Sequence, residues 1–286
     1  METWRVVIIS QVGDAAANID RVLRESGHEP VAVMTARPVD DGPERQQFFL
    51  RVFSESPRDL DILVPANSKR IAPLIAPYEP DLVVCCGFPW LIPPEALAVP
   101  LLGAINMHPS LLPRWRGPFP VAWAIRCGED LGSTVHRMDE TLDTGPILAQ
   151  GSVPFEDEWS WQELGPKLGA LEAELLRQAL ERIAAGDAGE TQPATGDPYA
   201  HDFEDDYLWV DWSKPVEEVL RQIRAWQFVG FTPGQERGPL AEIGGETVRI
   251  LRGSRDPADG PEIECGDGAI RLSATEPASS GFTDLA

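Results

Sequence analysis

Apolar and polar residues follow two different periods in the first half of the chain. Short, nearly continuous apolar blocks predict buried strands at residues 4–10, 30–35, 61–65 and 81–86. Between them, apolar residues spaced three or four apart predict helices at 14–26, 46–53 and 69–76. Strands that alternate with helices in this way form a parallel sheet covered by helices on both faces. The expected fold is therefore α/β, with a doubly wound, Rossmann-like and mostly parallel sheet.

A long amphipathic helix is expected to close this first domain. Its apolar residues are separated by three or four positions or a multiple: Leu164, Leu168, Leu171, Leu175, Ala179 and Ile183. The segment 186–196 contains Gly, Pro and Asp, which is typical of a connection. Beyond it, a helix capped by Ser213 and reaching Trp226 precedes alternating runs at 247–251 and 263–272. We therefore expect two domains, residues 1–190 and a smaller, β-rich and OB-like domain at 205–286.

Candidate chemistry gathers at the end of one further strand. The apolar run 99–104 leads into Asn106 and His108, which are two residues apart and therefore share one face. Pro109 stops the strand, and open α/β sheets place their sites at such strand ends. Further along, Asp143 lies in a loop between the strand-like runs 134–138 and 146–150. A carboxylate in this loop can face the amide and the imidazole.

Together these segments resemble the folate-dependent formyltransferase family. The motifs that carry the resemblance are Asn106-Met107-His108, the turn Ser110-Leu111-Leu112-Pro113 and Asp143-Thr144-Gly145, and the similarity is nearly continuous from 85 to 150. The resemblance implies that Asn106, His108 and Asp143 are catalytic. It implies 10-formyltetrahydrofolate as the formyl donor and no metal. It also implies a set of folate-binding positions: Phe88, Trp90, Leu91, Ile92, Ser110, Leu111, Leu112, Pro113, Asp139 and Gly145.

Each of these residues also has an ordinary structural explanation when taken alone. Asn106 suits a strand-end turn, His108 a buried core position and Asp143 a turn before Thr-Gly. Their joint occurrence with the Ser-Leu-Leu-Pro turn favours a site. Arg114 and Arg116 are either a solvated basic loop or anchors for an anionic group of the substrate. His136 lies on a predicted strand and is interpreted as structural.

Composition restricts the partners. The formal net charge is −22, and residues 205–286 hold 8 Lys and Arg against 15 Asp and Glu, which disfavours binding to nucleic acid. The four cysteines, Cys85, Cys86, Cys127 and Cys265, lack metal-ligand spacing. A turn with a single glycine at 11–14 does not match the dinucleotide fingerprint of dehydrogenases. No signal peptide and no apolar run near membrane length is present, so a cytoplasmic protein without membrane contact is expected.

These observations lead to an expected activity. We expect an N-formyltransferase that acts on the amine of a small molecule, such as an amino-acid-derived compound, a siderophore precursor or an amino sugar. The alternative acceptor within the family is methionyl-tRNA. The helix at 213–226 resembles the C-terminal region of the enzymes that use this acceptor and of their sugar-modifying relatives. Residues 227–234 depart from the family pattern after that helix. Alternatives from another class are a folate-binding regulatory protein and a formyltetrahydrofolate hydrolase.

Overall fold

Two compact units make up the chain. The structure, a computed structural model, describes residues 2–38, 43–154, 161–193, 198–229, 237–256 and 260–278. The first unit combines Met1–Gly117 with Leu131–Tyr199, and the second combines Pro118–Asp130 with Ala200–Ala286. The segment 118–130 therefore belongs to the second unit by its contacts, whereas the sequence ranges 1–190 and 205–286 assign it to the first domain.

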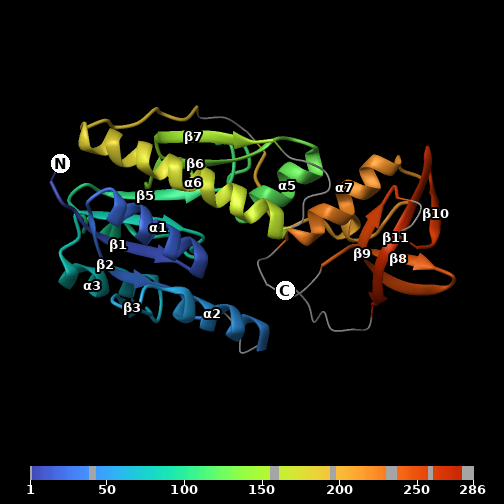
Figure 1. Cartoon of the computed structure of the whole chain (residues 1–286), viewed down its shortest axis with the longest axis horizontal. Helices are drawn as coiled ribbons and strands as arrows, with labels where there is room; N and C mark the ends of the chain where they lie inside the picture. The colour runs from blue at the N-terminus through green and yellow to red at the C-terminus, as the bar shows by residue number, and fades with distance from the viewer. Residues whose placement is uncertain are drawn as a thin grey trace. The chain divides into compact units, whose positions relative to one another are not determined.

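A seven-stranded sheet forms the centre of the first unit (Figure 1). Its strands lie in the order β3-β2-β1-β4-β5-β6-β7, and the last two pairings, β5 with β6 and β6 with β7, are antiparallel. The fold is therefore α/β with a mostly parallel sheet, as the alternating pattern predicts. The elements of this unit are β1 (Arg5–Ser10), α1 (Gly13–Glu25), β2 (Glu29–Met34), α2 (Pro43–Glu55), β3 (Asp61–Leu63), α3 (Ile71–Ile75), β4 (Leu82–Cys86), α4 (Pro94–Leu97), β5 (Ala104–His108), β6 (Leu131–Arg137), β7 (Ile147–Val153) and α6 (Trp161–Ala184).

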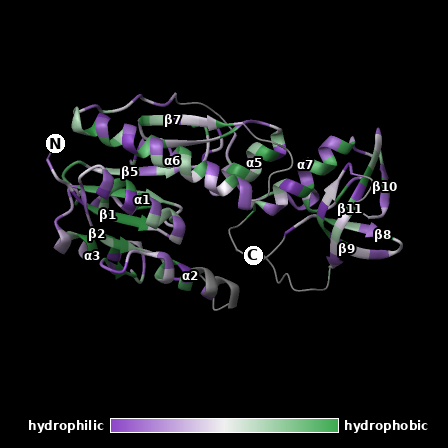
Figure 2. Ribbon diagram, viewed as in Figure 1, coloured by the Kyte–Doolittle hydropathy of each residue, from purple (hydrophilic) through white to green (hydrophobic). Residues whose placement is uncertain are grey.

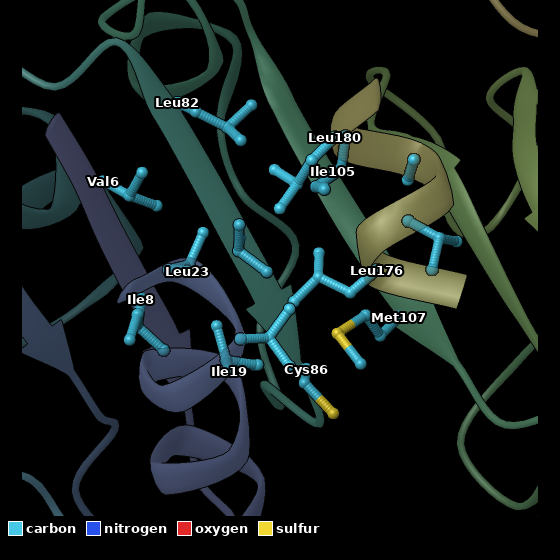
Figure 3. Close-up of a cluster of buried hydrophobic side chains, with 14 of the residues drawn as sticks. Val6, Ile8, Ile19, Leu23, Leu82, Cys86, Ile105, Met107, Leu176 and Leu180 are labelled. Carbon is cyan, nitrogen blue, oxygen red and sulfur yellow. The ribbon is translucent and has the colours of Figure 1, made fainter. Parts of the chain in front are cut away.

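Apolar side chains from both faces of this sheet are buried. On one face, residues of β1, β4 and β5 pack against α1 and α6 (Figure 3). On the other face, alternate residues of β1, β2 and β4 pack against α3 and α4. This two-sided burial explains why the central strands are nearly continuous apolar runs, seen as green strands in Figure 2. The helices carry a mixed pattern because each buries only one side.

The second unit pairs helices with an antiparallel sheet. Its elements are α5 (Pro120–Cys127), α7 (Val216–Gln227), β8 (Leu240–Ile243), β9 (Glu246–Ser254), β10 (Glu262–Cys265) and β11 (Gly268–Pro277). The four strands lie in the order β10-β11-β9-β8, and α7 packs on them through Val219, Leu220 and Ile223. The expected β-rich second unit is therefore present, and within the described residues its sheet is open, with β8 and β10 at the edges.

Two boundaries differ from the sequence expectation. β5 begins only at Ala104, because the preceding run 99–103 forms a turn with Gly103 at φ 81°. α7 begins at Val216 and not at Ser213, since the N–H of Val216 donates to the carboxylate of Asp267 at 2.8 Å. The unusual stretch at 227–234 is described only up to Val229, and the rest of it lies outside the described residues. Among the described helices, none is long and apolar enough to cross a membrane.

Candidate active site

β5 presents an amide and an imidazole on the same side of the sheet. Ile105 and Met107 point into the core beside α6, so the alternating residues Asn106 and His108 face the opposite side. β6 pairs antiparallel with β5 and places His136 opposite Asn106 and Thr134 opposite His108. The strand register therefore brings a second histidine next to the predicted pair.

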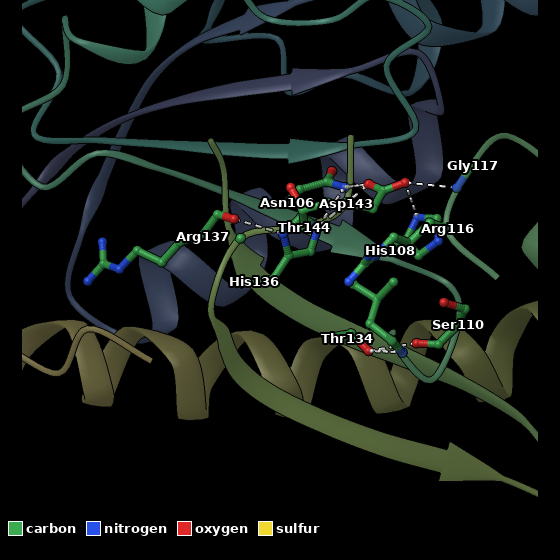
Figure 4. A network of polar contacts seen from close by, with 12 residues as sticks. Asn106, His108, Ser110, Arg116, Gly117, Thr134, His136, Arg137, Asp143 and Thr144 are labelled. Atoms are coloured by element: carbon green, nitrogen blue, oxygen red, sulfur yellow. Dashed lines mark hydrogen bonds and ion pairs between the residues drawn. The ribbon is translucent and has the colours of Figure 1, made fainter. Parts of the chain in front are cut away.

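The loop after β6 returns across β5 and brings Asp143 to these side chains (Figure 4). Because β6 is antiparallel, its carboxyl end lies near the beginning of β5, and the loop must run back. Asp143 Oδ1 accepts a hydrogen bond from Asn106 Nδ2 at 3.4 Å, and Oδ2 accepts one from the Gly117 N–H at 3.0 Å. The three residues predicted as catalytic therefore lie together, with the carboxylate only 10% exposed.

Two histidines flank the carboxylate of Asp143 at equal distances. His108 Nδ1 lies 3.7 Å from Oδ2, and His136 Nε2 lies 3.7 Å from Oδ1. The opposite ring nitrogens face backbone carbonyls, with His108 Nε2 2.9 Å from the Trp115 oxygen and His136 Nδ1 2.8 Å from the Arg137 oxygen. Because a carbonyl oxygen only accepts, both of these nitrogens carry hydrogen. In the neutral rings, the lone pairs of His108 Nδ1 and His136 Nε2 therefore point into the site.

Both N–H groups of the Asn106 amide are engaged in this arrangement. Its two N–H groups point to His136 Nε2 at 3.3 Å and to Asp143 Oδ1 at 3.4 Å. Both distances are long for hydrogen bonds of this type, so each bond is weak. His136, interpreted from the sequence as structural, thus orients the side chain of Asn106. One of these weak bonds can be exchanged for a bond to another acceptor at little cost.

Burial and neighbouring charges shift the pKa values of both the Asp143 carboxylate and the His108 imidazole. Burial by itself would raise the pKa of Asp143, but His108, His136 and the Gly117 N–H outweigh it and lower that pKa to about 2. Burial lowers the pKa of His108, although the charge of Asp143 opposes this shift. At neutral pH the site therefore holds a carboxylate beside a neutral imidazole with a free lone pair.

The Ser-Leu-Leu-Pro turn is held by side chains of β6 and β7. Ser110 donates to the Arg114 oxygen at 2.8 Å, and its own carbonyl accepts from the Thr134 hydroxyl at 2.6 Å. Gln150 donates to the Leu112 oxygen at 2.8 Å. The Leu112–Pro113 peptide is cis. Ser110 and Leu112 are buried within the turn's own packing, and a role of residues 110–113 toward folate remains a prediction.

Two loops near Asn106 carry the other predicted folate positions. The first follows β4, whose Cys85 pairs with Asn106, and there the rings of Phe88 and Trp90 meet edge to face at 5.5 Å. Leu91 in this loop is 48% exposed, and Leu142 beside Asp143 is 50% exposed. Ile92, by contrast, is buried in the core.

The loop that carries Asp143 is internally bonded. The carboxylate of Asp139 accepts from the N–H and hydroxyl of Thr141 and from the hydroxyl of Thr144. Gly145 lies against the backbone of β6, because a Cβ at this position would come within 1.9 Å of the Arg137 oxygen. These contacts predetermine the loop conformation, while contact of Asp139 and Gly145 with folate remains a prediction.

Of the two predicted anchor arginines, Arg116 is engaged in the framework of the site. Its guanidinium donates to Gln192 Oε1 at 2.7 Å, and Arg114 is exposed with its guanidinium 5.1 Å from the ring centroid of Trp115. Gln192 itself, which no sequence signal indicated, contacts the Asp143 loop. His136 could have been found from the alternation with Thr134 along one strand face. Among the described residues, no group of three or more His, Cys, Asp or Glu could hold a metal ion.

Comparison with known proteins gives one family. A model of the formyl transferase family matches residues 4–180. The methionyl-tRNA formyltransferase of Pseudomonas syringae pv. tomato is 32% identical over 99% of this chain and 94% of its own length. That of Methylobacterium nodulans is 33% identical over 90% of this chain and 86% of its own length. The family model ends at residue 180, whereas the matches to the two relatives extend into the second unit.

Solved structures share the fold at lower identity. HypX from Aquifex aeolicus in complex with tetrahydrofolic acid superposes with a TM-score of 0.69 at 18% identity over 97% of this chain, which spans 45% of HypX. A 4-N formyltransferase from Francisella tularensis has a TM-score of 0.66 at 19% identity, covering 87% of this chain and 97% of its own. At these identities the similarity demonstrates the fold.

Proposed function

This chain belongs to the formyl transferase family and is a 10-formyltetrahydrofolate-dependent enzyme, and from this premise we propose that it formylates the amino group of methionyl-tRNA. The observation that supports this acceptor is the 32% identity to a methionyl-tRNA formyltransferase over 99% of the chain. The similarity is not limited to the part that carries Asn106, His108 and Asp143. It includes the second unit, so the comparisons favour methionyl-tRNA over the small amine expected from composition.

The residues around Asn106 fit a reduced folate. A pteridine is a flat, largely apolar ring with polar edges, and sites for such rings combine apolar walls with a few polar groups. Leu91 and Leu142 offer exposed apolar surface on the two loops, and Phe88 and Trp90 lie in the same loop as Leu91. We assign the donor to these loops, where the folate supplies the formyl group.

His108 and Asp143 act on the proton of the attacking amine in this proposal. With Nε2–H donated to Trp115, His108 can accept a proton at Nδ1, which faces Asp143. The resulting imidazolium is stabilised by the neighbouring carboxylate, which stays ionised because its pKa is about 2. Asp143 therefore supports the proton transfer without itself gaining the proton, and His108 gives this proton to the folate nitrogen when the bond between that nitrogen and the formyl carbon breaks.

Asn106 acts on the formyl oxygen. Attack on a formyl carbon moves negative charge onto that oxygen, and an N–H group held nearby stabilises it. Asn106 can turn one N–H from its long bonds with His136 or Asp143 toward this oxygen. The bond that remains keeps the amide oriented.

A small amine is the second candidate acceptor, and the charge of the protein favours it. The net charge is −22, and residues 205–286 carry 15 acidic against 8 basic residues. Proteins that hold an RNA backbone use clustered Lys and Arg, because neutralising phosphates drives binding. The acidic second unit is therefore poorly suited to a long tRNA contact.

One assay separates the two acceptors. Purified protein is incubated with 10-formyltetrahydrofolate and either methionylated initiator tRNA, a panel of amino sugars and amino-acid-derived amines, or no acceptor. Formylated methionyl-tRNA at kcat/KM well above that of every small amine is the expected result. Transfer confined to a small amine would overturn the tRNA proposal, and release of formate alone would indicate a hydrolase.

A further inference from the structure

Gln192 uses the amino group of its side-chain amide on the loop that carries Asp143. The residue follows α6 and is only 7% exposed. Its Nε2 donates to the Asp143 oxygen at 3.0 Å and to the Gly145 oxygen at 2.8 Å. Its Oε1 accepts from Arg116 at 2.7 Å. We propose that Gln192 is a positioning residue, which holds the Asp143 carboxylate in place for formyl transfer; this inference rests on the proposed role of Asp143.

The backbone of Asp143 needs such a restraint. Its φ is 56°, a left-handed conformation that costs energy for a residue with a side chain. Strained residues of this kind persist where surrounding contacts leave them no alternative. The carbonyl oxygens of Asp143 and of Gly145 both accept a hydrogen bond from the side chain of Gln192. The amide of Gln192 therefore holds the backbone at two points directly after the strained Cα of Asp143.

The other side of the loop is held by β6. Gly145 is pressed against the Arg137 oxygen so closely that no Cβ could be accommodated. The Arg137 N–H donates to the Pro146 oxygen at 2.8 Å. Segment 189–192 is itself attached to the start of β7, because Glu190 and Ile147 exchange two backbone hydrogen bonds of 2.8 Å. The Asp143 loop thus lies between β6 and Gln192 and is contacted from both sides.

Gln192 also links the Asp143 loop to the turn at residues 115–117, which completes the site. Arg116 bonds to Gln192, and the next residue, Gly117, donates its N–H to Asp143 Oδ2. The backbone of Trp115 on the same turn accepts from His108. One buried side chain therefore sets the spacing between the carboxylate, its N–H donor and the acceptor that fixes the histidine tautomer.

Removing the amide should misplace the carboxylate. Two carbonyl oxygens would lose their donors, and the loop would relax toward an ordinary backbone conformation. Displacement of a reacting group by about 1 Å can lower a rate by about a hundredfold. Substrate contacts would persist, so the effect belongs in kcat and not in the affinity for folate.

The experiment compares Gln192→Leu and Gln192→Glu with wild-type enzyme and with Gln178→Leu and Gln178→Glu. Gln178 lies exposed on α6 and bonds only within its own helix, to Glu174 at 3.1 Å among the contacts of the described residues. For each protein, kcat and KM for 10-formyltetrahydrofolate, the equilibrium binding of tetrahydrofolate and the thermal midpoint are measured, with whichever acceptor the wild type uses.

We expect Gln192→Leu to lower kcat by about tenfold to a hundredfold with tetrahydrofolate affinity within about threefold of wild type. Gln192→Glu keeps the acceptor for Arg116 but turns a carboxylate toward two carbonyls. The protonated form of this Glu can donate to one of the carbonyls. The ratio of the variant's kcat to the wild-type kcat should therefore increase as the pH is lowered from about 8 to about 5.5. The Gln178 variants should match wild type.

A role in packing alone would lower the thermal midpoint of the Gln192 variants without a pH-dependent kcat ratio. A kcat within about twofold of wild type in Gln192→Leu, or a flat ratio in Gln192→Glu, would overturn the inference. If Gln192→Leu fails to fold, the ratio for Gln192→Glu still decides. A wild-type enzyme without transfer activity would contradict the proposed function, and the two failures are thereby distinguished.

Discussion

At the residue scale, the carboxylate of Asp143 and the imidazole of His108 form the unit on which the proposed chemistry depends. The carboxylate is buried and ionised, with a pKa of about 2. The imidazole is buried and its pKa is lowered, so it is neutral near pH 7. A neutral base beside a fixed negative charge is able to gain a proton during the reaction and lose it afterwards.

Removing either group should abolish most of the activity. We expect His108→Ala and Asp143→Asn each to lower kcat by about a hundredfold or more, the usual contribution of a general acid or base. Asp143→Asn preserves the size of the side chain, removes its charge and replaces one of its two acceptor oxygens with an NH2 donor. Steady-state kinetics measure the effect, and His201→Ala in the second unit serves as a control. Near-normal turnover in a folded variant would remove that residue from the mechanism.

Glu172 on α6 gives a separate prediction for stability. Burial, opposed by the Ser133 hydroxyl 3.3 Å away, raises its pKa from 4.5 to about 7. A group with a raised pKa contributes its stabilisation below the unfolded pKa, and this is lost as the pH rises through the folded pKa. Wild-type protein therefore loses stability between about pH 4.5 and about pH 7 through this group. Partial exposure of Glu172 limits the size of the effect.

Glu172→Gln should remove that pH dependence. The amide keeps an acceptor for Ser133 but cannot ionise. We expect the thermal midpoint of the variant to exceed that of wild type at about pH 8, and the difference to shrink or reverse at about pH 5. Thermal unfolding followed by circular dichroism at the two pH values measures this. The same difference in thermal midpoint between variant and wild type at both pH values would show that ionisation of Glu172 does not cause the loss of stability.

At the scale of single elements, α6 contributes most to the core beneath the site. Leu176 on this helix is fully buried and packs on the same face of the sheet as Ile105 and Met107 of β5. Because Asn106 and His108 alternate with these two residues, the packing of α6 fixes the strand from which both polar side chains project. The stability of α6 and the geometry of the site are therefore linked.

Leu176→Ala should destabilise the protein by about 2–5 kcal/mol, the cost of removing a buried leucine and leaving a cavity. Urea denaturation gives the free energy of unfolding. An unchanged m-value would show that the variant exposes the same surface area on unfolding as the wild type. Gln178→Ala on the exposed side of the same helix should change the free energy of unfolding by less than about 0.5 kcal/mol. A small effect at Leu176 would mean that the core repacks around the missing side chain.

At the scale of the whole molecule, the excess of acidic residues dominates. With a formal charge of −22, the folded chain repels itself, and this repulsion is long-range at low ionic strength. The surface ion pairs do not compensate, because exposed pairs contribute little. The same field would oppose the approach of any polyanionic acceptor.

Salt should therefore stabilise the protein. We expect the thermal midpoint to rise by a few degrees between about 10 mM and about 500 mM KCl, because screening weakens the repulsion between acidic groups. The experiment uses a chloride salt because sulfate also stabilises proteins through its exclusion from the protein surface. Differential scanning calorimetry at several salt concentrations measures the trend, and a midpoint that falls with added KCl would contradict it.

The sequence by itself determined the fold class, the family and the identity of the three proposed catalytic residues. Periodicity is a local property, so the strands and helices of the first unit could be predicted from neighbouring residues. The two-residue spacing of Asn106 and His108 specified a shared face wherever the strand was placed. The resemblance of short motifs to the formyltransferase family indicated Asp143 as the partner of these two residues. The antiparallel course of β6 explains how the loop with Asp143 reaches them.

Only the tertiary structure decided which distant residues contact each other, including those that hold the trio in place. Gln192 reaches Asp143 across 49 positions, and α7 is capped by Asp267, 51 positions from Val216. Neither link has a local signal, since a glutamine or an aspartate in a loop is ordinarily solvated. The same is true of His136, whose contact with Asn106 depends on strand register. Local periodicity determines which elements form, but contacts between distant segments depend on how those elements pack.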